Sequence, residues 1–167
     1  VSLGLFTFLY SSILSFVKNS FKSTLIYLSQ AWIGLALFLL AIDGGSLNYS
    51  SLTAISIGSI STLVLLSLAA QLGHRYLVFA KIATLGLPGM IWFSVLLFSI
   101  KMTLNLNVLW IVVFGLGYLL QAISLVTCRA SPVAQPDKKV KIKFWFTVGV
   151  QFVSGLGLYW LEFGVTK

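Results

Sequence analysis

The stretch WIVVFGLGYLLQAISLV, Trp110 to Val126, would show almost only apolar side chains around a helix of about five turns. Six runs of this kind make up most of the chain: Val1–Val17, Thr24–Ile42, Leu52–Leu72, Tyr76–Ile100, Val108–Thr127 and Phe144–Phe163. A helix needs about 20 apolar residues to cross a hydrocarbon core of about 30 Å. Strands of a membrane barrel would instead alternate in polarity over about 10 residues. The runs therefore predict an all-α, polytopic integral membrane helix bundle that forms a single domain over residues 1–167.

The charge content supports the same interpretation. Only 8% of the 167 residues are charged and 59% are hydrophobic, with a mean hydropathy of +1.03. A soluble domain carries about a quarter of its residues as charged side chains, because water must solvate its surface. This chain is too poor in charge for such a surface, so lipid is its expected surroundings.

The first run decides whether six or five helices cross the membrane. It is short, and it contains Ser11, Ser12 and Ser15. It lacks the positive start and the small-residue cleavage site of a secretory signal, so we expect a helix here. The prediction is six transmembrane helices, or five if this run lies at the interface.

Basic residues predict the orientation, because Lys and Arg in short loops stay on the cytoplasmic side. Nine of them fall in or beside the first, third and fifth gaps: Lys18, Lys22, Arg75, Lys81, Arg129, Lys138, Lys139, Lys141 and Lys143. The other side receives only Lys101 and Lys167. These gaps are expected in the cytoplasm, including a basic loop over residues 128–143, and the C-terminus is expected outside. A bacterial inner membrane is the default localisation.

The net charge is +8, and four of the eleven basic residues fall in the stretch KKVKIKFWF. Lys138, Lys139, Lys141 and Lys143 alternate with other residues just before an apolar run, which suits contact with anionic lipid headgroups at about 1 kcal/mol per basic residue. Without stacking platforms or a folded basic surface, we expect no nucleic-acid partner.

Three glutamines lie inside predicted helices at a similar depth. Gln30, Gln121 and Gln151 each lie six or seven residues from the expected cytoplasmic end, or about 10 Å at a rise of about 1.5 Å per residue. Amides in hydrocarbon need partners. The pattern predicts a shared polar layer, which either bonds helices together or lines a small cavity open to the cytoplasm.

Two further segments suggest how helices meet. In TLGLPG, Pro88 has no N–H to donate and lies beside Gly86 and Gly89, which predicts a kinked hinge or a locally unwound stretch that exposes carbonyls. Small residues recur every four positions in the third predicted helix, beginning just before its apolar run, and predict a helix-packing face, used within the chain or by a partner. They are Ser50, Ala54, Gly58 and Thr62.

No reactive centre is predicted. His74 is the only histidine, Cys128 is the only cysteine, and the acids Asp43, Asp137 and Glu162 lie near or beyond helix ends. No metal, cofactor or catalytic residue is therefore expected. The expected function is a noncatalytic subunit or assembly factor of a larger membrane complex, with other membrane subunits or a second copy as partner. The alternatives are a small permease or substrate-binding component of a transporter and, on the basic turn at His74 and Arg75 alone, a lipid-modifying enzyme.

Overall fold

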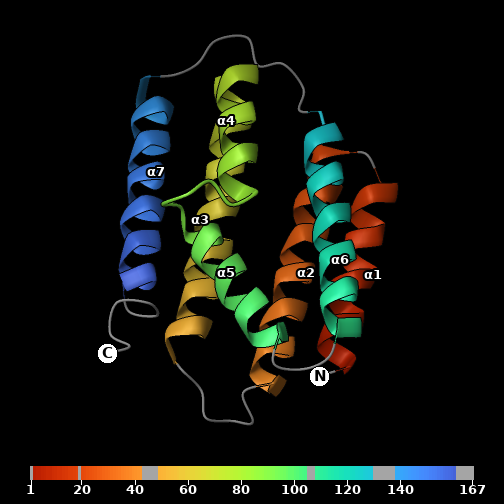
Figure 1. Ribbon diagram of the computed structural model, residues 1–167. Helices are drawn as coiled ribbons and strands as arrows, with labels where there is room; N and C mark the ends of the chain where they lie inside the picture. Colours follow the sequence, from red (N-terminus) through yellow and green to blue (C-terminus); the bar gives the residue numbers. More distant parts are fainter. Residues whose placement is uncertain (1, 19, 43–48, 105–107, 130–137, 161–167) are drawn as a thin grey trace. The chain divides into compact units, whose positions relative to one another are not determined.

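The computed structural model describes residues 2–18, 20–42, 49–104, 108–129 and 138–160, with the side chains of 49–52, 54, 102–104 and 108 outside this description. Seven helices make up this part of the chain: α1 (Ser2–Val17), α2 (Phe21–Ile42), α3 (Tyr49–Leu72), α4 (His74–Thr84), α5 (Ile91–Leu104), α6 (Val108–Thr127) and α7 (Lys138–Tyr159) (Figure 1). The only strand-like pairing among the described residues is one isolated bridge between Ser20 and Arg129. The prediction of an all-helical fold is confirmed for these residues.

Three helical segments are long and apolar enough to cross a membrane. They are Phe21–Ile42, Ile55–Leu72 and Leu109–Thr127. Ser2–Val17 and Ile91–Lys101 are also apolar but shorter. The chain is therefore compatible with membrane localisation by the length and composition of its helices.

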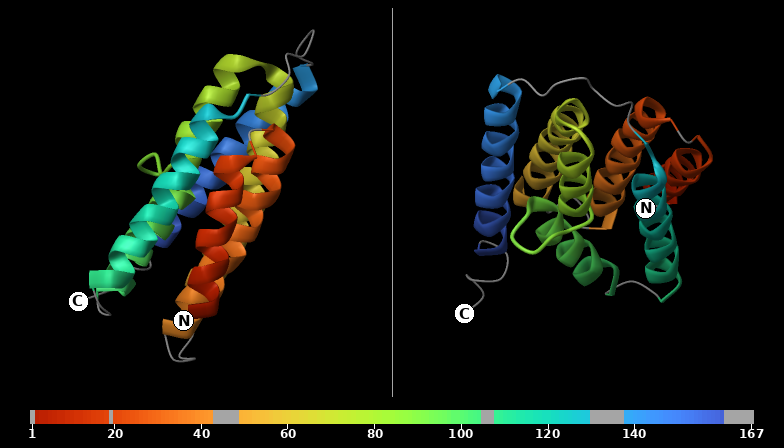
Figure 2. Two further views of the ribbon diagram at one scale, coloured as in Figure 1. Left: turned by 90° about the vertical axis from the view of Figure 1, so that its right-hand side faces the viewer. Right: turned by 90° about the horizontal axis from the view of Figure 1, so that it is seen from above.

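The chain divides into two compact units. Unit 1 contains residues Val1–Leu52 and Phe98–Arg129, and unit 2 contains Thr53–Leu97 and Ala130–Lys167. In unit 1, α1 packs against both α2 and α6 (Figure 2). In unit 2, α7 contacts α3, α4 and the first half of α5, and α5 also contacts α3. Each unit joins segments that are far apart in the sequence.

Unit 1 is held together by a close approach of two helix backbones. A Cβ atom added to Gly34 would lie 2.6 Å from the backbone nitrogen of Phe8, and one added to Gly4 would meet the backbone of Phe38. Beside this crossing, the rings of Phe8 and Phe114 stack with centroids 5.7 Å apart, which ties α1 to α6. Small residues allow such an approach because no side chain separates the backbones.

The polar and apolar faces of α6 are reversed relative to a soluble helix. Gln121 and Ser124 are buried, whereas the exposed side chains form an apolar stripe. The stripe consists of Leu109, Val112, Leu116, Leu119, Ile123 and Val126. A surface helix in water would bury such a stripe and expose its polar residues. An apolar surrounding accounts for this arrangement.

The fourth predicted run, Tyr76–Ile100, is two helices rather than one kinked helix. Thr84 ends α4, and Gly86 follows with a φ of 95° and donates its N–H to the Ala83 carbonyl, a common helix C-cap. Pro88 and Gly89, with a φ of 88° at Gly89, then form a turn closed by the bond from Met90 N–H to the Leu87 carbonyl. Pro followed by a glycine of positive φ is the signature of a type II turn.

The last helix begins earlier than predicted. It starts at Lys138 rather than at Phe144, so the lysines expected in a loop over 128–143 occupy the first two turns of α7. Residues 130–137, which contain Pro132 and Pro136, lie outside the described residues. Lysine is a good helix former, so the lysine-rich stretch extends the helix beyond its apolar part.

Candidate functional site

The polar centre of unit 2 is the side chain of Thr62 on α3. Its hydroxyl oxygen accepts hydrogen bonds from the indole N–H of Trp92 on α5 at 2.6 Å and from the amide of Gln151 on α7 at 2.8 Å. The same amide also donates to the Ser61 hydroxyl at 3.2 Å. Thr62 and Gln151 are both 0% exposed. One buried hydroxyl thus connects three helices.

The other end of the Gln151 amide has no partner. Its oxygen Oε1 is buried and makes no hydrogen bond to the described residues. Turning the amide over would present the oxygen to the two hydroxyls and leave the NH₂ group there instead. In either orientation, one polar end of this side chain is buried and unsatisfied, at a cost of about 1–3 kcal/mol.

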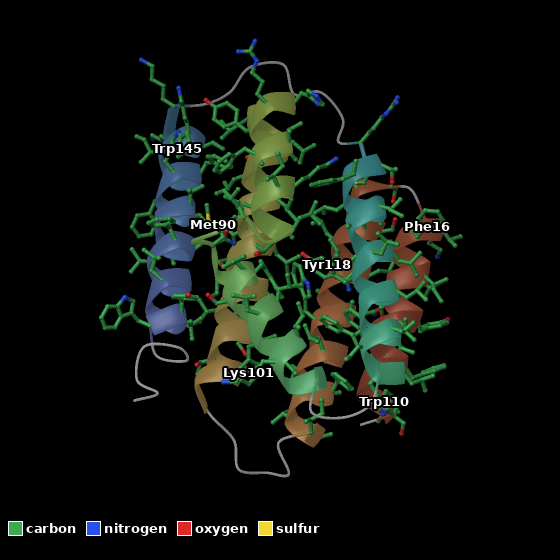
Figure 3. All side chains as sticks on the ribbon, in the orientation of Figure 1. Phe16, Met90, Lys101, Trp110, Tyr118 and Trp145 are labelled. Carbon is green, nitrogen blue, oxygen red and sulfur yellow. The ribbon has the colours of Figure 1, made fainter. Side chains whose placement is uncertain are left out.

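α7 covers the break between α4 and α5. A Cβ atom on Gly155 would lie 2.5 Å from the Gly89 carbonyl oxygen and 2.7 Å from the Ile91 nitrogen, so only glycine fits there. Ser94 of α5 donates its hydroxyl to the Gly155 carbonyl at 2.9 Å. Met90 lies at the break, where the connecting loop extends toward α7 (Figure 3). Irregular backbone that water does not reach must be covered by protein, and here α7 provides the cover.

Unit 1 has a second polar cluster on the inner face of α1. Gln121 of α6 donates its amide to the Ser12 hydroxyl at 3.1 Å. One turn further, the Ser15 and Ser124 hydroxyls lie 2.6 Å apart, and Ser124 donates to the Ser15 carbonyl at 2.7 Å. These serines are buried between α1 and α6. They therefore do not require α1 to lie at an interface.

The three predicted glutamines have different surroundings. Gln121 and Gln151 are buried in different units, and each bonds hydroxyl groups of its own unit. Gln30 is exposed on α2. No hydrogen bond among the described residues joins any two of these glutamines. The observed bonds connect helices within a unit.

The predicted small-residue face of α3 is described in part. Gly58 contacts the Ile91 side chain, with a Cβ position 3.4 Å from it, and Thr62 forms the polar centre described above. The side chains of Ser50 and Ala54 lie outside the described residues. At Gly58 and Thr62, the face packs against the start of α5.

The basic residues of α7 lie above an aromatic cluster. Lys138, Lys139, Lys141 and Lys143 are all exposed. Below them, Phe144 is 0% exposed and meets the ring of Tyr76 edge-on at 5.3 Å. Phe79 of α4 contacts both Phe144 at 6.2 Å and Trp145 at 5.9 Å. Trp145 is seen near the N-terminal end of α7 (Figure 3).

Comparisons with known proteins give no family for this chain: no protein-family model, no curated protein and no solved structure matches it. The site must therefore be interpreted from its own geometry. Sequence reasoning did not single out Trp92 as a hydrogen-bond donor or Ser12, Ser15 and Ser124 as a helix contact. The available signal was the spacing of Ser12 and Ser15, which places both on one face of a helix.

Proposed function

We propose that the chain is a noncatalytic subunit or accessory factor of a larger membrane complex. Its outward-facing glycines carry this proposal. A Cβ atom added to Gly115 of α6, or to Gly149 or Gly157 of α7, would meet nothing within 4 Å. Gly4, Gly34 and Gly155, in contrast, all lie against a neighbouring backbone.

Glycine inside a helix lowers helix stability by about 1 kcal/mol relative to alanine. A glycine in such a position is therefore unfavourable unless it allows another helix to come close. Gly149, Val153 and Gly157 recur every four residues and are exposed. That spacing lets another helix approach closely within a membrane. A helix of a partner subunit or of a second copy is the occupant that this face fits.

The same proposal includes six membrane crossings, in which α4 and α5 together make the fourth. Two observations support the orientation predicted from the basic residues. In unit 1, a bridge pairs Arg129 with Ser20, which is two residues after Lys18 in the sequence. In unit 2, α4 and α7 begin at the same end (Figure 1), and Arg75 and the α7 lysines belong to the first turns of these helices. We propose that these ends face the cytoplasm, in a bacterial inner membrane by default.

The test of the subunit proposal is the mass of the solubilised chain. In mild detergent, light scattering should give a protein mass well above the 18.3 kDa of one chain. The double variant Gly149→Leu with Gly157→Leu should shift the mass toward a single chain while far-UV circular dichroism is unchanged. Ile142→Leu, also on the exposed side of α7, is the control and should leave the mass unaltered. A wild-type chain that is a stable monomer refutes the proposal.

The orientation has its own test. Cys128 is buried, so the background of labelling by an impermeant maleimide should be low. Lys139→Cys and Lys101→Cys should then react on opposite sides of the membrane, with Lys139→Cys protected in intact cells. Labelling of both from outside contradicts the orientation.

A small permease or substrate-binding component is the second candidate. It is favoured by the break between α4 and α5 and by the unpartnered Gln151 oxygen near it, because broken helices form substrate sites in transporters. A solute that binds there should raise the melting temperature of the purified chain, and Gln151→Leu should abolish this rise. If Gln151→Leu folds and changes no binding or transport, this candidate is refuted.

A further inference from the structure

Two basic segments that are far apart in the sequence lie together in unit 2. Arg75 is the second residue of α4, and Lys138 and Lys141 belong to the first turns of α7. Both helices begin at the same end of the unit (Figure 1). At this end, the edge-on contact of Tyr76 on α4 with the fully buried Phe144 on α7 holds the two helices next to each other.

The aromatic contacts also show which side of α7 faces α4. Phe79 of α4 touches the rings of both Phe144 and Trp145, so α4 lies in the direction between these two residues. At about 100° per residue, Lys141 points in that same direction and Lys138 about 70° from it. Lys139 and Lys143 point about 150–170° away by the same geometry.

The same reasoning applies to α4. Its α7-facing direction is given by Tyr76 and Phe79, and Arg75 lies about 70° from it at about 100° per residue. His74 points about 170° away. Arg75, Lys138 and Lys141 therefore converge above the aromatic cluster, and the other basic residues of these turns do not.

No carboxylate among the described residues can neutralise these three cations, since the three acids of the chain are at positions 43, 137 and 162. Immediately beside them, Trp145 is 51% exposed and Ile142 is 70% exposed. A cationic group next to exposed apolar side chains matches an amphiphile with an anionic head. Arginine in particular binds phosphate oxygens through two parallel hydrogen bonds.

We propose that Arg75, Lys138 and Lys141 form one binding site for the phosphate of an anionic glycerophospholipid, whose acyl chains lie along Ile142 and Trp145. The site differs from a diffuse attraction between a lysine-rich stretch and a charged surface, in which all four α7 lysines would count equally. It requires only that the chain lies in a membrane, and it is independent of whether a partner subunit exists.

The test is lipid binding to the purified full chain, measured by native mass spectrometry with phosphatidylglycerol and with phosphatidylcholine. Phosphatidylglycerol should bind more tightly. Arg75→Gln, Lys138→Gln and Lys141→Gln should each weaken its binding about fivefold, from about 1 kcal/mol per basic residue. Lys139→Gln and Lys143→Gln are matched controls on the same two turns, and each should change the affinity less than about twofold.

Two outcomes overturn the proposal. Equal losses for the site and control lysines would mean a diffuse electrostatic anchor. Full displacement of phosphatidylglycerol by glycerol 3-phosphate at equal concentration would mean a site for a soluble phosphate compound. Because all five side chains are exposed, the variants should fold. Circular dichroism checks this, and Arg75→Lys should retain part of the affinity.

Discussion

Replacing Thr62 by valine tests whether one hydroxyl holds three helices together. Thr62→Val exchanges the hydroxyl for a methyl group of similar volume, so the packing of α3 is kept. Two donors lose their acceptor: the indole N–H of Trp92 at 2.6 Å and the amide of Gln151 at 2.8 Å. Because Thr62 is 0% exposed, solvent cannot replace the lost oxygen without opening the unit.

The expected loss follows from the two bonds. A hydrogen bond between membrane helices contributes about 0.6 kcal/mol on average and up to about 1.7 kcal/mol. Gln151 keeps the Ser61 hydroxyl at 3.2 Å, so its loss should be near the lower value. The short bond from Trp92 should be near the upper value. Together they predict that Thr62→Val lowers the free energy of unfolding by about 2 kcal/mol.

The assay is reversible unfolding of the purified chain in mixed micelles, followed by far-UV circular dichroism. Thr7→Val is the matched control, because Thr7 is only half-buried and its hydroxyl bonds the Leu3 carbonyl of its own helix. It should change the unfolding free energy by less than about 0.5 kcal/mol. Adding Trp92→Phe to Thr62→Val should cost less than the two single changes summed, since donor and acceptor are then removed together.

The reasoning is refuted if Thr62→Val and Thr7→Val have the same effect. It is also refuted if the double variant is fully additive, because additivity would mean that Trp92 and Thr62 do not interact.

The other predictions use the same unfolding measurement. Gly155→Ala should lower the free energy of unfolding by about 1–3 kcal/mol, because its methyl group would meet the backbone between α4 and α5. Gly149→Ala, on the open face of α7, should leave the free energy of unfolding unchanged or raise it. Equal effects of the two variants would contradict the packing of α7 on the break. Gly89→Ala should cost about 1–3 kcal/mol from its positive φ alone, and a neutral result would exclude the type II turn. Ser124→Ala should cost about 1 kcal/mol by removing the contacts with Ser15, and no change would show that α1 and α6 do not meet there.

The positions of the helices could largely be predicted from the sequence. The run Val108–Thr127 coincides with α6, because the length of an apolar run limits where a helix can begin and end. The same reasoning fails at Lys138–Lys143, where helix propensity rather than hydropathy decides the boundary. Hydropathy reports which residues lipid tolerates, and a lysine-rich first turn can extend beyond the lipid.

The break at Gly86–Gly89 was predictable in place but not in form. Proline alone suggests a kink within a continuous helix. The pair of glycines with positive φ permits a C-cap followed by a turn, and Gly155 on α7 provides room for it. That room lies more than 60 residues away in the sequence, so local reasoning could not weigh it.

The glutamines show a second limit. Their depth along a helix follows from the rise per residue, but the direction in which each side chain points depends on how the helix is rotated. That rotation is set by packing partners elsewhere in the chain. Gln30 is exposed for this reason, while Gln121 and Gln151 each meet hydroxyls that sequence reasoning had not connected with them.

The cover that α7 places over the break has a consequence for biosynthesis. The ribosome makes Gly89 and Trp92 well before Gln151 and Gly155, and all of α6 is made in between. Until α7 has been made and packs against them, the turn and the Thr62 hydroxyl lack the helix that covers them. Unit 2 can therefore mature only after α7 has been made, and a nascent chain stalled before Lys138 should be a substrate for quality control.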